Sequence, residues 1–379
     1  MKEWCLLIAG EKSGEEHALS FLPALKKLNP NLEFFGVGGD ELQAQGMELS
    51  YHLKDFSSFG FSEVVNKIPF YLKALNKLTQ EVKDRQCKVA ILIDFQDFNL
   101  KLAKKLAKQG VQILYYVAPQ AWAWKAYRAK VLQNTVHTLF SILPFEKKWF
   151  NDRGVSKIIS VPHPLLINYA KALADLETRT YESMNEKVRL LLLPGSRNDE
   201  VRFLLPEFEE TVKHLRKTLN KNVEVGIVYS SNVKQEHWNS FKQNIDHSWT
   251  NTDLEKAMKW ADIALATSGT VTLATGLFQL PTVVAYKGSL LNQYIFETFV
   301  KYDKPISLTN LILDQIVFPE FIQERATSFN MTKALLKLIQ DPNEFNRVKM
   351  SLTKLPNLLS GDGEPAEHMM KAFHLKESV

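Results

Sequence analysis

The 379-residue chain contains only two cysteines, Cys5 and Cys87, and neither a Cys-X-X-Cys pair nor a Cys/His cluster. This pattern excludes a disulfide framework and argues against a zinc site, so we expect two reduced structural thiols. No apolar run approaches the roughly 20 residues that span a membrane, and the run at residues 4–9 is too short for the core of a signal peptide. We therefore expect a cytoplasmic protein whose membrane contact, if any, is peripheral.

Neither sign of charge is in large excess, because 47 basic residues face 42 acidic ones and leave a net charge of +5. This balance excludes a strongly electrostatic nucleic-acid binder, and we expect no nucleic-acid partner. The sequence also lacks an Asp-X-Asp motif, which disfavours a metal-bound nucleotide-sugar site; we expect no metal and no cofactor. What the chain does have is length and 45% hydrophobic residues, enough for two domains with large cores.

Short apolar runs alternate with helical patterns in both halves of the chain, which predicts two doubly wound α/β domains with parallel sheets facing a cleft. We expect an N-terminal domain at residues 1–168, a polar linker at 169–187, a second domain at 188–340, and helices at 341–379 that pack back on an N-terminal domain. The expected strands lie at residues 4–9, 32–37, 89–93, 112–117, 136–142, 157–161, 188–193, 223–228, 263–266 and 282–285.

Arg197 follows a strand and a sharp turn, Pro194-Gly195-Ser196. In an open parallel sheet, ligands bind at this edge, and a guanidinium there suits a diphosphate because its planar fork donates two hydrogen bonds at once. A surface ion pair is the competing interpretation. The segment Ser268-Gly269-Thr270 lies between a strand and a helix and predicts a second anion site. Two such anion-binding elements in the same half of the chain favour a nucleotide-binding site.

Asp94 follows the apolar strand at residues 89–93, where a carboxylate is well placed to act as a general base. Asp97, three residues later, is assigned a helix-capping or supporting role instead. The turn after the first strand carries Glu11 and Ser13, which are candidates for hydrogen bonds to sugar hydroxyls, although the same turn is compatible with simple helix capping. His163 is interpreted as structural rather than as the base.

Two aromatic segments complete the candidates. Trp122 and Trp124 precede Lys125, and this aromatic-basic loop suits an acyl chain or a phosphate, with ordinary packing as the alternative. Residues 56–75 mix aromatic side chains with lysines, so they are either core or an interfacial segment that enters a bilayer. The candidate membrane contacts are Phe59, Phe61, Val64, Ile68, Phe70 and Tyr71.

In this order, the motifs resemble those of the lipid-A-disaccharide synthases, inverting glycosyltransferases of the GT-B type. The resemblance runs from Ile8 to about Gln323 and is carried most specifically by the Trp-X-Trp and Asp-Phe-Asn segments. The motifs are Ala9-Gly10-Glu11-Lys12-Ser13-Gly14, Ile93-Asp94-Phe95-Gln96-Asp97-Phe98-Asn99, Tyr116-Val117-Ala118-Pro119-Gln120-Ala121-Trp122-Ala123-Trp124, Leu143-Pro144-Phe145-Glu146, His163-Pro164-Leu165, Leu193-Pro194-Gly195-Ser196-Arg197, Ser268-Gly269-Thr270 and Pro319-Glu320-Phe321-Ile322-Gln323.

The resemblance implies a UDP-2,3-diacylglucosamine donor, a 2,3-diacylglucosamine 1-phosphate acceptor, and a β(1→6)-linked disaccharide 1-phosphate plus UDP as products. It also implies contact with the inner face of the inner membrane of a Gram-negative bacterium, and a homodimer with exchanged C-terminal segments. The implied catalytic residues are Asp94 as the base and Glu11. The implied substrate contacts are Ser13, Asp97, Asn99, Trp122, Trp124, Ser196, Arg197, Ser268, Gly269, Thr270, Asn310, Glu320 and Gln323.

Three positions depart from the family pattern. Glu15 stands where the family usually has Asp, Gln96 replaces a proline and is expected to loosen the Asp94 turn, and Ala274 replaces a Glu suited to the ribose, for which Thr275 is a candidate substitute. The alternative functions are a UDP-N-acetylglucosamine 2-epimerase, another GT-B transferase, or a non-catalytic scaffold that binds a UDP-sugar or a lipid.

Overall fold

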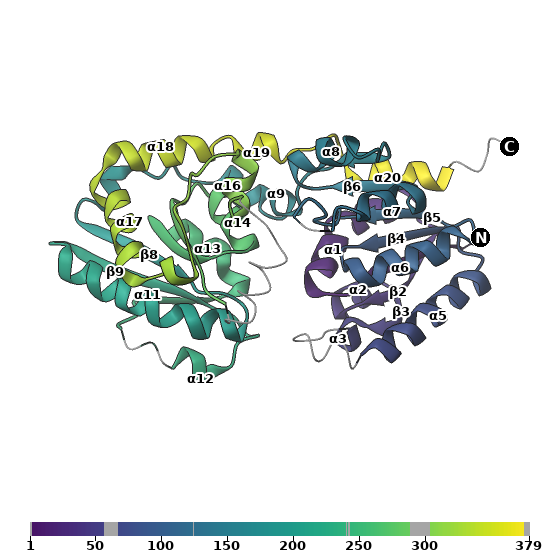
Figure 1. Cartoon of the computed structure of the whole chain (residues 1–379), viewed down its shortest axis with the longest axis horizontal. Coiled ribbons are helices and arrows are strands. Elements are labelled where there is room, and N and C mark those ends of the chain that lie inside the picture. Colours follow the sequence, from purple (N-terminus) through teal and green to yellow (C-terminus); the bar gives the residue numbers. More distant parts are fainter. Residues whose placement is uncertain are drawn as a thin grey trace. The chain divides into compact units, whose positions relative to one another are not determined.

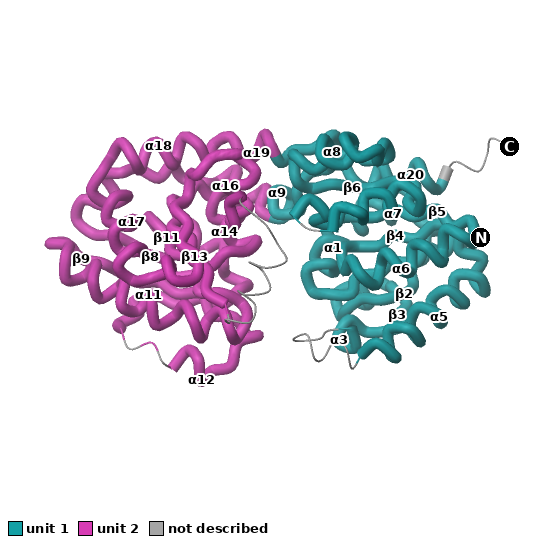
Figure 2. The backbone as a smooth tube through the Cα atoms, in the orientation of Figure 1, with its two compact units in different colours: residues 1–168, 359–379 teal, residues 169–358 magenta. Residues whose placement is uncertain are grey.

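The computed structural model describes residues 2–56, 67–123, 125–239, 241, 243–288 and 304–374. The chain divides into two compact units, residues 1–168 with 359–379 and residues 169–358 (Figure 2). Among the described residues, no helix is both long and apolar enough to cross a bilayer.

The first unit is built on a seven-stranded parallel sheet with the order β3-β2-β1-β4-β5-β6-β7 (Figure 1). Its strands are β1 (Glu3–Ala9), β2 (Leu32–Gly38), β3 (Glu48–His52), β4 (Val89–Ile93), β5 (Gln112–Tyr116), β6 (Thr138–Ser141) and β7 (Ile158–Ser160). Its helices are α1 (Lys12–Leu28), α2 (Asp40–Ala44), α3 (Leu53–Phe56), α5 (Ile68–Asp84), α6 (Gln96–Ala107), α7 (Arg128–Thr135), α8 (Pro144–Asn151), α9 (Pro164–Asn168) and α20 (Pro365–His374).

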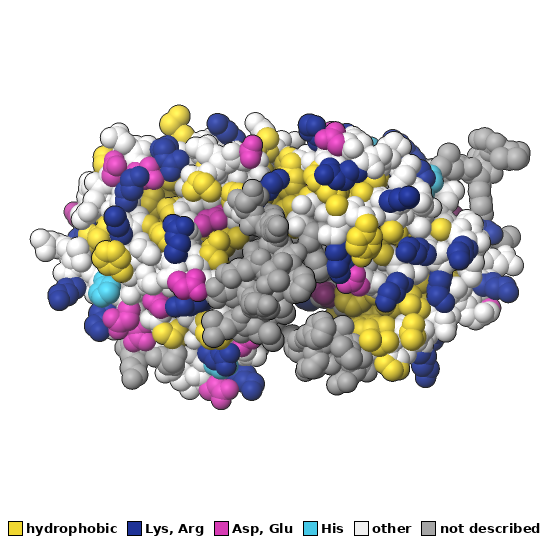
Figure 3. Space-filling model, in the orientation of Figure 1, with side chains coloured by type: hydrophobic (Ala, Val, Ile, Leu, Met, Phe, Trp, Pro, Cys, Tyr) yellow, Lys and Arg dark blue, Asp and Glu magenta, His cyan; other side chains and the backbone are white. Residues whose placement is uncertain are grey.

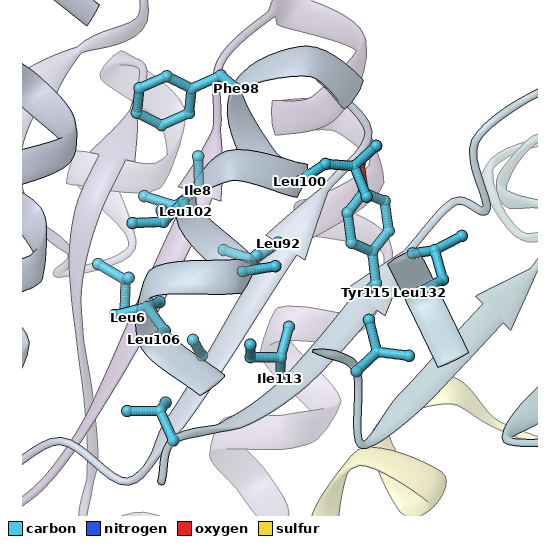
Figure 4. Packing of buried hydrophobic residues seen from close by; sticks show 14 of the residues in the cluster. Leu6, Ile8, Leu92, Phe98, Leu100, Leu102, Leu106, Ile113, Tyr115 and Leu132 are labelled. Atoms are coloured by element: carbon cyan, nitrogen blue, oxygen red, sulfur yellow. The ribbon is translucent and has the colours of Figure 1, made fainter. Parts of the chain in front are cut away.

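The central strand β4 is apolar and buried along its whole length, as expected where helices cover both faces of a parallel sheet. Alternate side chains, such as Leu92 on β4 and Ile113 on β5, point into the core beneath α5, α6 and α7 (Figure 4). On the other face, Tyr116 of β5 packs against Phe21 of α1, with 4.8 Å between the ring centroids. Cys5 and Cys87 are buried free thiols, and burial raises the pKa of Cys87 to about 11.

The second unit has a six-stranded parallel sheet with the order β10-β9-β8-β11-β12-β13. Its strands are β8 (Lys187–Leu193), β9 (Asn222–Tyr229), β10 (His247–Thr250), β11 (Ile263–Thr267), β12 (Thr282–Tyr286) and β13 (Glu320–Ile322). Its helices are α10 (Ala170–Ala174), α11 (Asn198–Thr218), α12 (Gln235–Trp238), α13 (Leu254–Trp260), α14 (Thr270–Leu277), α16 (Leu308–Leu313), α17 (Ser328–Gln340), α18 (Pro342–Leu352) and α19 (Leu355–Leu358), with 3₁₀ turns at Tyr181–Met184, Asn251–Asp253 and Gln323–Arg325. Helices α11 and α17 pack on one another and on β11 and β12.

The predicted α/β class is confirmed, but two boundaries differ from the expectation. Residues 169–187 belong to the second unit, where Arg179 donates hydrogen bonds to the main-chain carbonyls of Met258, Ala261 and Phe278. The chain re-enters the first unit at Leu359 rather than at residue 341, because α18 packs against α17 of the second unit. There α20 packs against α1 of the same chain.

Candidate active site

Asp94 lies at the point of the first sheet where the strand order reverses, between β1 and β4. In doubly wound sheets, ligands bind at this switch point, beyond the carboxyl ends of the strands. The loop after β1 carries Glu11, and the loop after β4 begins with Asp94. The two carboxylates lie close enough for Glu11 to raise the pKa of Asp94, so the structure brings the two predicted catalytic residues together.

The Asp94 turn adopts a left-handed backbone that side-chain-bearing residues rarely populate, with φ of 43° at Asp94 and 41° at Phe95. Buried polar groups hold it in place. The Asn99 amide donates to the carbonyls of Ile93 and Asp94 at 3.0 and 2.9 Å, and the Tyr115 hydroxyl donates to the Asp94 carbonyl at 2.7 Å. Strain of this kind typically occurs at functional sites.

Gln96 takes part in the hydrogen bonding of this turn through its side chain. Its side chain bonds to the Asp94 carboxylate and accepts a hydrogen bond from the guanidinium of Arg128. Arg128 is almost completely buried and also pairs with Asp97 at 2.6 Å. Asp97 therefore supports the turn through Arg128 and does not cap α6 with its side chain.

Burial, together with the neighbouring Glu11 carboxylate, raises the pKa of Asp94 to about 6, while the hydrogen bond from Gln96 acts in the opposite direction. A carboxylate with a pKa just below neutrality is ionised at pH 7 and more basic than an ordinary aspartate. This combination suits a general base.

The first loop leaves its candidate side chains accessible, since Glu11 and Ser13 are both exposed. Glu11 is the N-cap residue of α1, but its side chain makes no capping bond, so helix capping does not explain it. Gly10 is needed because a Cβ there would lie 2.8 Å from the ring of Phe95. Glu15 is buried and accepts from the Leu42 amide at 3.1 Å.

Trp122 is anchored by Glu146, which was not among the predicted site residues. Its indole nitrogen donates to Glu146 at 3.0 Å, and its ring meets Phe145 edge-on. Glu146 is buried, which raises its pKa to about 8. Trp124 lies outside the described residues. His163 is buried, with a pKa lowered to about 3 by burial, which agrees with a structural role.

The predicted membrane segment divides into packed and exposed residues. Phe59, Phe61 and Val64 lie outside the described residues. Phe70 and Tyr71 are half-buried and contact the aromatic ring of Phe56 in the core. Ile68 is 50% exposed, and Leu72, one helical turn later, is 54% exposed. Figure 3 shows hydrophobic side chains gathered over α5.

In the second unit, the two predicted phosphate-binding elements follow neighbouring strands. β8 pairs with β11, with Leu193 opposite Ala266, and the order of the strands reverses between them. The loops that carry Arg197 and Ser268 therefore leave from the switch point of the second sheet, where ligands bind in this fold.

Arg197 is 78% exposed and its Nη1 lies 2.9 Å from a carboxylate oxygen of Glu200. The other Glu200 oxygen accepts from the amide of Ser196 at 3.1 Å. Gly195 has φ of +127°, and a Cβ there would lie 2.6 Å from the Glu200 carboxylate. The ion pair that competed with the phosphate interpretation is thus present.

The second element opens onto solvent at the start of α14. Gly269 and Thr270 are exposed, while the hydroxyl of Ser268 donates to the Ile306 carbonyl at 3.0 Å. Thr275 is fully buried and donates to the carbonyl of Thr272. This corrects its candidacy as a ribose contact in place of the missing glutamate.

Asn310 and Glu320 are joined by a hydrogen bond inside the second unit. Asn310 is fully buried, and its carbonyl oxygen accepts from the amides of Val317 and Phe318, both at 2.8 Å. Its side-chain nitrogen donates to Glu320 at 2.7 Å. Gln323 has φ of 52° and accepts from the Gly288 amide at 3.1 Å.

Sequence reasoning missed three side chains near these loops. Glu200 stands three residues after Arg197 in the first helical turn, and that spacing was the available signal. Tyr286 ends β12 and lies close enough to Glu200 and Arg197 for both to influence its pKa. Arg128 follows the aromatic-basic loop, and nothing in the sequence connects it to Asp97.

Two Rossmann-like units with a carboxylate at one switch point and an arginine with helix-terminal amides at the other define a protein of the GT-B fold. Two solved structures share the fold, covering 97–98% of this chain and 99% of each neighbour. They are the UDP-GlcNAc 2-epimerase from Neisseria meningitidis, with TM-score 0.58 and 11% identity, and the spinosyn rhamnosyltransferase SpnG, with TM-score 0.59 and 10% identity.

The family model for lipid-A-disaccharide synthetase matches residues 5–368. A lipid-A-disaccharide synthase from Myxococcus xanthus is 34% identical over 334 residues, covering 85% of this chain and 84% of the relative. The chain belongs to the lipid-A-disaccharide synthase family.

Proposed function

We propose that this glycosyltransferase moves 2,3-diacylglucosamine from UDP to the 6-hydroxyl of 2,3-diacylglucosamine 1-phosphate. The acceptor oxygen attacks the anomeric carbon on the face opposite UDP and gives a β(1→6) linkage. The bond from the anomeric carbon to the diphosphate oxygen breaks, UDP leaves with that electron pair, and the acceptor's hydroxyl proton passes to Asp94. One displacement inverts the centre.

The observation that carries this proposal is the Asp94 turn. Its left-handed backbone, its fixed position at the switch point and a pKa of about 6 describe a carboxylate built to accept a proton near neutral pH. Exposed Glu11 and Ser13 are proposed to hold sugar hydroxyls. Buried Asn99 is proposed to position the turn rather than to touch substrate.

The second unit is proposed to bind UDP. Arg197, the Ser196 amide and the amino end of α14 at Ser268–Thr270 stabilise the charge that grows on the leaving diphosphate. Gln323 is proposed to contact the donor. Asn310 and Glu320 are proposed to hold in position the segment that precedes Gln323.

We further propose peripheral contact with the inner face of the inner membrane. Ile68 and Leu72 supply an exposed apolar edge on α5. Lys104 of the next helix, α6, and Lys108 just after its end line a hollow of about 650 Å³ together with Lys130 of α7. Basic side chains lie over this region in Figure 3, and such charge attracts anionic lipid.

A homodimer is proposed as well, in which α20 exchanges between chains. Within one chain α20 packs on α1, and exchange would reproduce the same contact with a second copy. Light scattering coupled to gel filtration tests this state. A monomeric mass at micromolar concentration would contradict it.

Release of UDP tests the proposed reaction. Purified full-length protein with detergent-dispersed UDP-diacylglucosamine should release UDP only when diacylglucosamine 1-phosphate is added, and the disaccharide should appear in equal amount. Interconversion of UDP-N-acetylglucosamine without acceptor would instead support the epimerase. Binding of UDP without release in the presence of both substrates would support the scaffold.

A further inference from the structure

Glu200 uses both oxygens on the donors that the proposed function assigns to the diphosphate. One oxygen lies 2.9 Å from Arg197 Nη1 and the other 3.1 Å from the Ser196 amide nitrogen. The Glu200 side chain is only 12% exposed, whereas that of Arg197 is 78% exposed. A carboxylate therefore bridges a guanidinium and a main-chain amide, the two donor types that bind phosphate oxygens.

The loop is shaped to receive this carboxylate. Gly195 adopts φ of +127°, and its missing Cβ would lie 2.6 Å from a Glu200 oxygen and 2.8 Å from the Glu200 Cβ. Any side chain at residue 195 would collide with Glu200. Gly195 therefore permits both the reversal of the backbone after β8 and the close approach of the Glu200 side chain.

We propose that Glu200 competes with the donor diphosphate for Arg197 and the Ser196 amide, so that UDP binds by displacing this carboxylate and leaves with its help. The inference rests on the proposed UDP site. A carboxylate and a diphosphate cannot share the same donors without strong repulsion. Glu200 must therefore move aside when UDP binds, and its return favours release of the product.

Helix capping is the competing explanation, because an acid in the first turn stabilises any helix amino end. The chain offers a matched control for it. Asp199 occupies the same turn of α11 with the same charge, but it pairs with Arg202 at 3.0 Å. Capping predicts similar effects on UDP binding from both acids, whereas competition predicts an effect from Glu200 alone.

Calorimetric titration of UDP into the full chain separates these outcomes. E200Q should lower the Kd for UDP by about 3- to 10-fold and lower KM for the donor without raising kcat, since product leaves more slowly. D199N should change the Kd by less than about twofold. E200D keeps the charge but shortens the reach, so it should tighten UDP less than E200Q does and keeps the test available if E200Q does not fold.

An unchanged or raised Kd in E200Q, or equal tightening in E200Q and D199N, would overturn the competition. These results leave the proposed function intact as long as the wild-type chain binds UDP. Absence of UDP binding by the wild-type chain would instead refute the UDP site on which both proposals depend.

Discussion

The indole nitrogen of Trp122 donates a 3.0 Å hydrogen bond to the buried carboxyl group of Glu146. The other Glu146 oxygen accepts from the Leu143 amide at 3.4 Å. The loop after β5 is thereby tied to the start of α8. A buried acid in this position keeps its proton to higher pH, and burial raises the pKa of Glu146 to about 8.

This raised pKa predicts a pH-dependent stability. Because the folded protein holds the proton more tightly than the unfolded chain, the stabilisation is complete below the unfolded pKa of about 4.5 and is lost as pH rises through about 8. Between pH 5 and 8 the wild type should lose at least about 1 kcal/mol of unfolding free energy relative to E146Q. Urea unfolding of both proteins checks it; an equal difference at the two pH values would contradict it.

The pair Glu11 and Asp94 predicts the pH dependence of turnover. Protonation of Asp94, whose pKa is about 6, removes the base, so kcat should fall as pH drops through about 6. E11Q removes the neighbouring negative charge and should move this acid limb to lower pH, whatever it does to the maximal rate. E16Q, in the helix α1 that follows Glu11, is the control. If the acid limb of the pH profile of kcat is at the same pH in E11Q as in the wild type, Glu11 does not influence the ionisation of Asp94.

Asn99 predicts a split between turnover and binding. N99A removes the amide that donates to the carbonyls of Ile93 and Asp94 and should cost about 1–3 kcal/mol of stability. It should also lower kcat at least about tenfold with unchanged UDP affinity, because the base is displaced. L100A, the next residue in the same helix and part of the core (Figure 4), should cost about 2–5 kcal/mol and keep kcat. Equal kcat values in the two variants would remove the positioning role.

The exposed apolar edge of α5 predicts membrane affinity. The double variant I68D/L72D should bind anionic phospholipid vesicles about tenfold more weakly, because it loses apolar area and repels the lipid charge. L28D, which alters a similarly exposed leucine on α1, is the control. Sedimentation with vesicles measures both. Equal binding by all three proteins would exclude this edge from the contact.

The sequence predicts the sheets well where strands are buried on both sides. Residues 89–93 form β4 with the expected bounds. A short run of five apolar residues is typical of a strand that is buried on both faces of a parallel sheet. β3 and β10 escaped prediction because they are edge strands with polar, partly exposed side chains. Because these edge strands are only partly buried, their sequences contain no apolar run from which a strand could be predicted.

The candidate site shows the same division. The positions of Asp94 and Arg197 at the carboxyl edges of the sheets were predictable, because each lies in the segment that joins a strand to the following helix. Asn310 was chosen by resemblance, and the structure buries it with its hydrogen bonds satisfied by Val317, Phe318 and Glu320. The partnership of Glu200 with Ser196 depends on how the turn folds back, which no spacing rule reports.

The most direct test of the account compares D94N with R197A in one set of measurements on the full chain. We predict that D94N lowers turnover by about 100-fold or more while its Kd for UDP stays within about twofold of the wild type. R197A should raise the Kd for UDP at least about tenfold. Turnover of D94N close to that of the wild type would contradict the assignment of Asp94 as the base, and unchanged UDP affinity in R197A would contradict the nucleotide site.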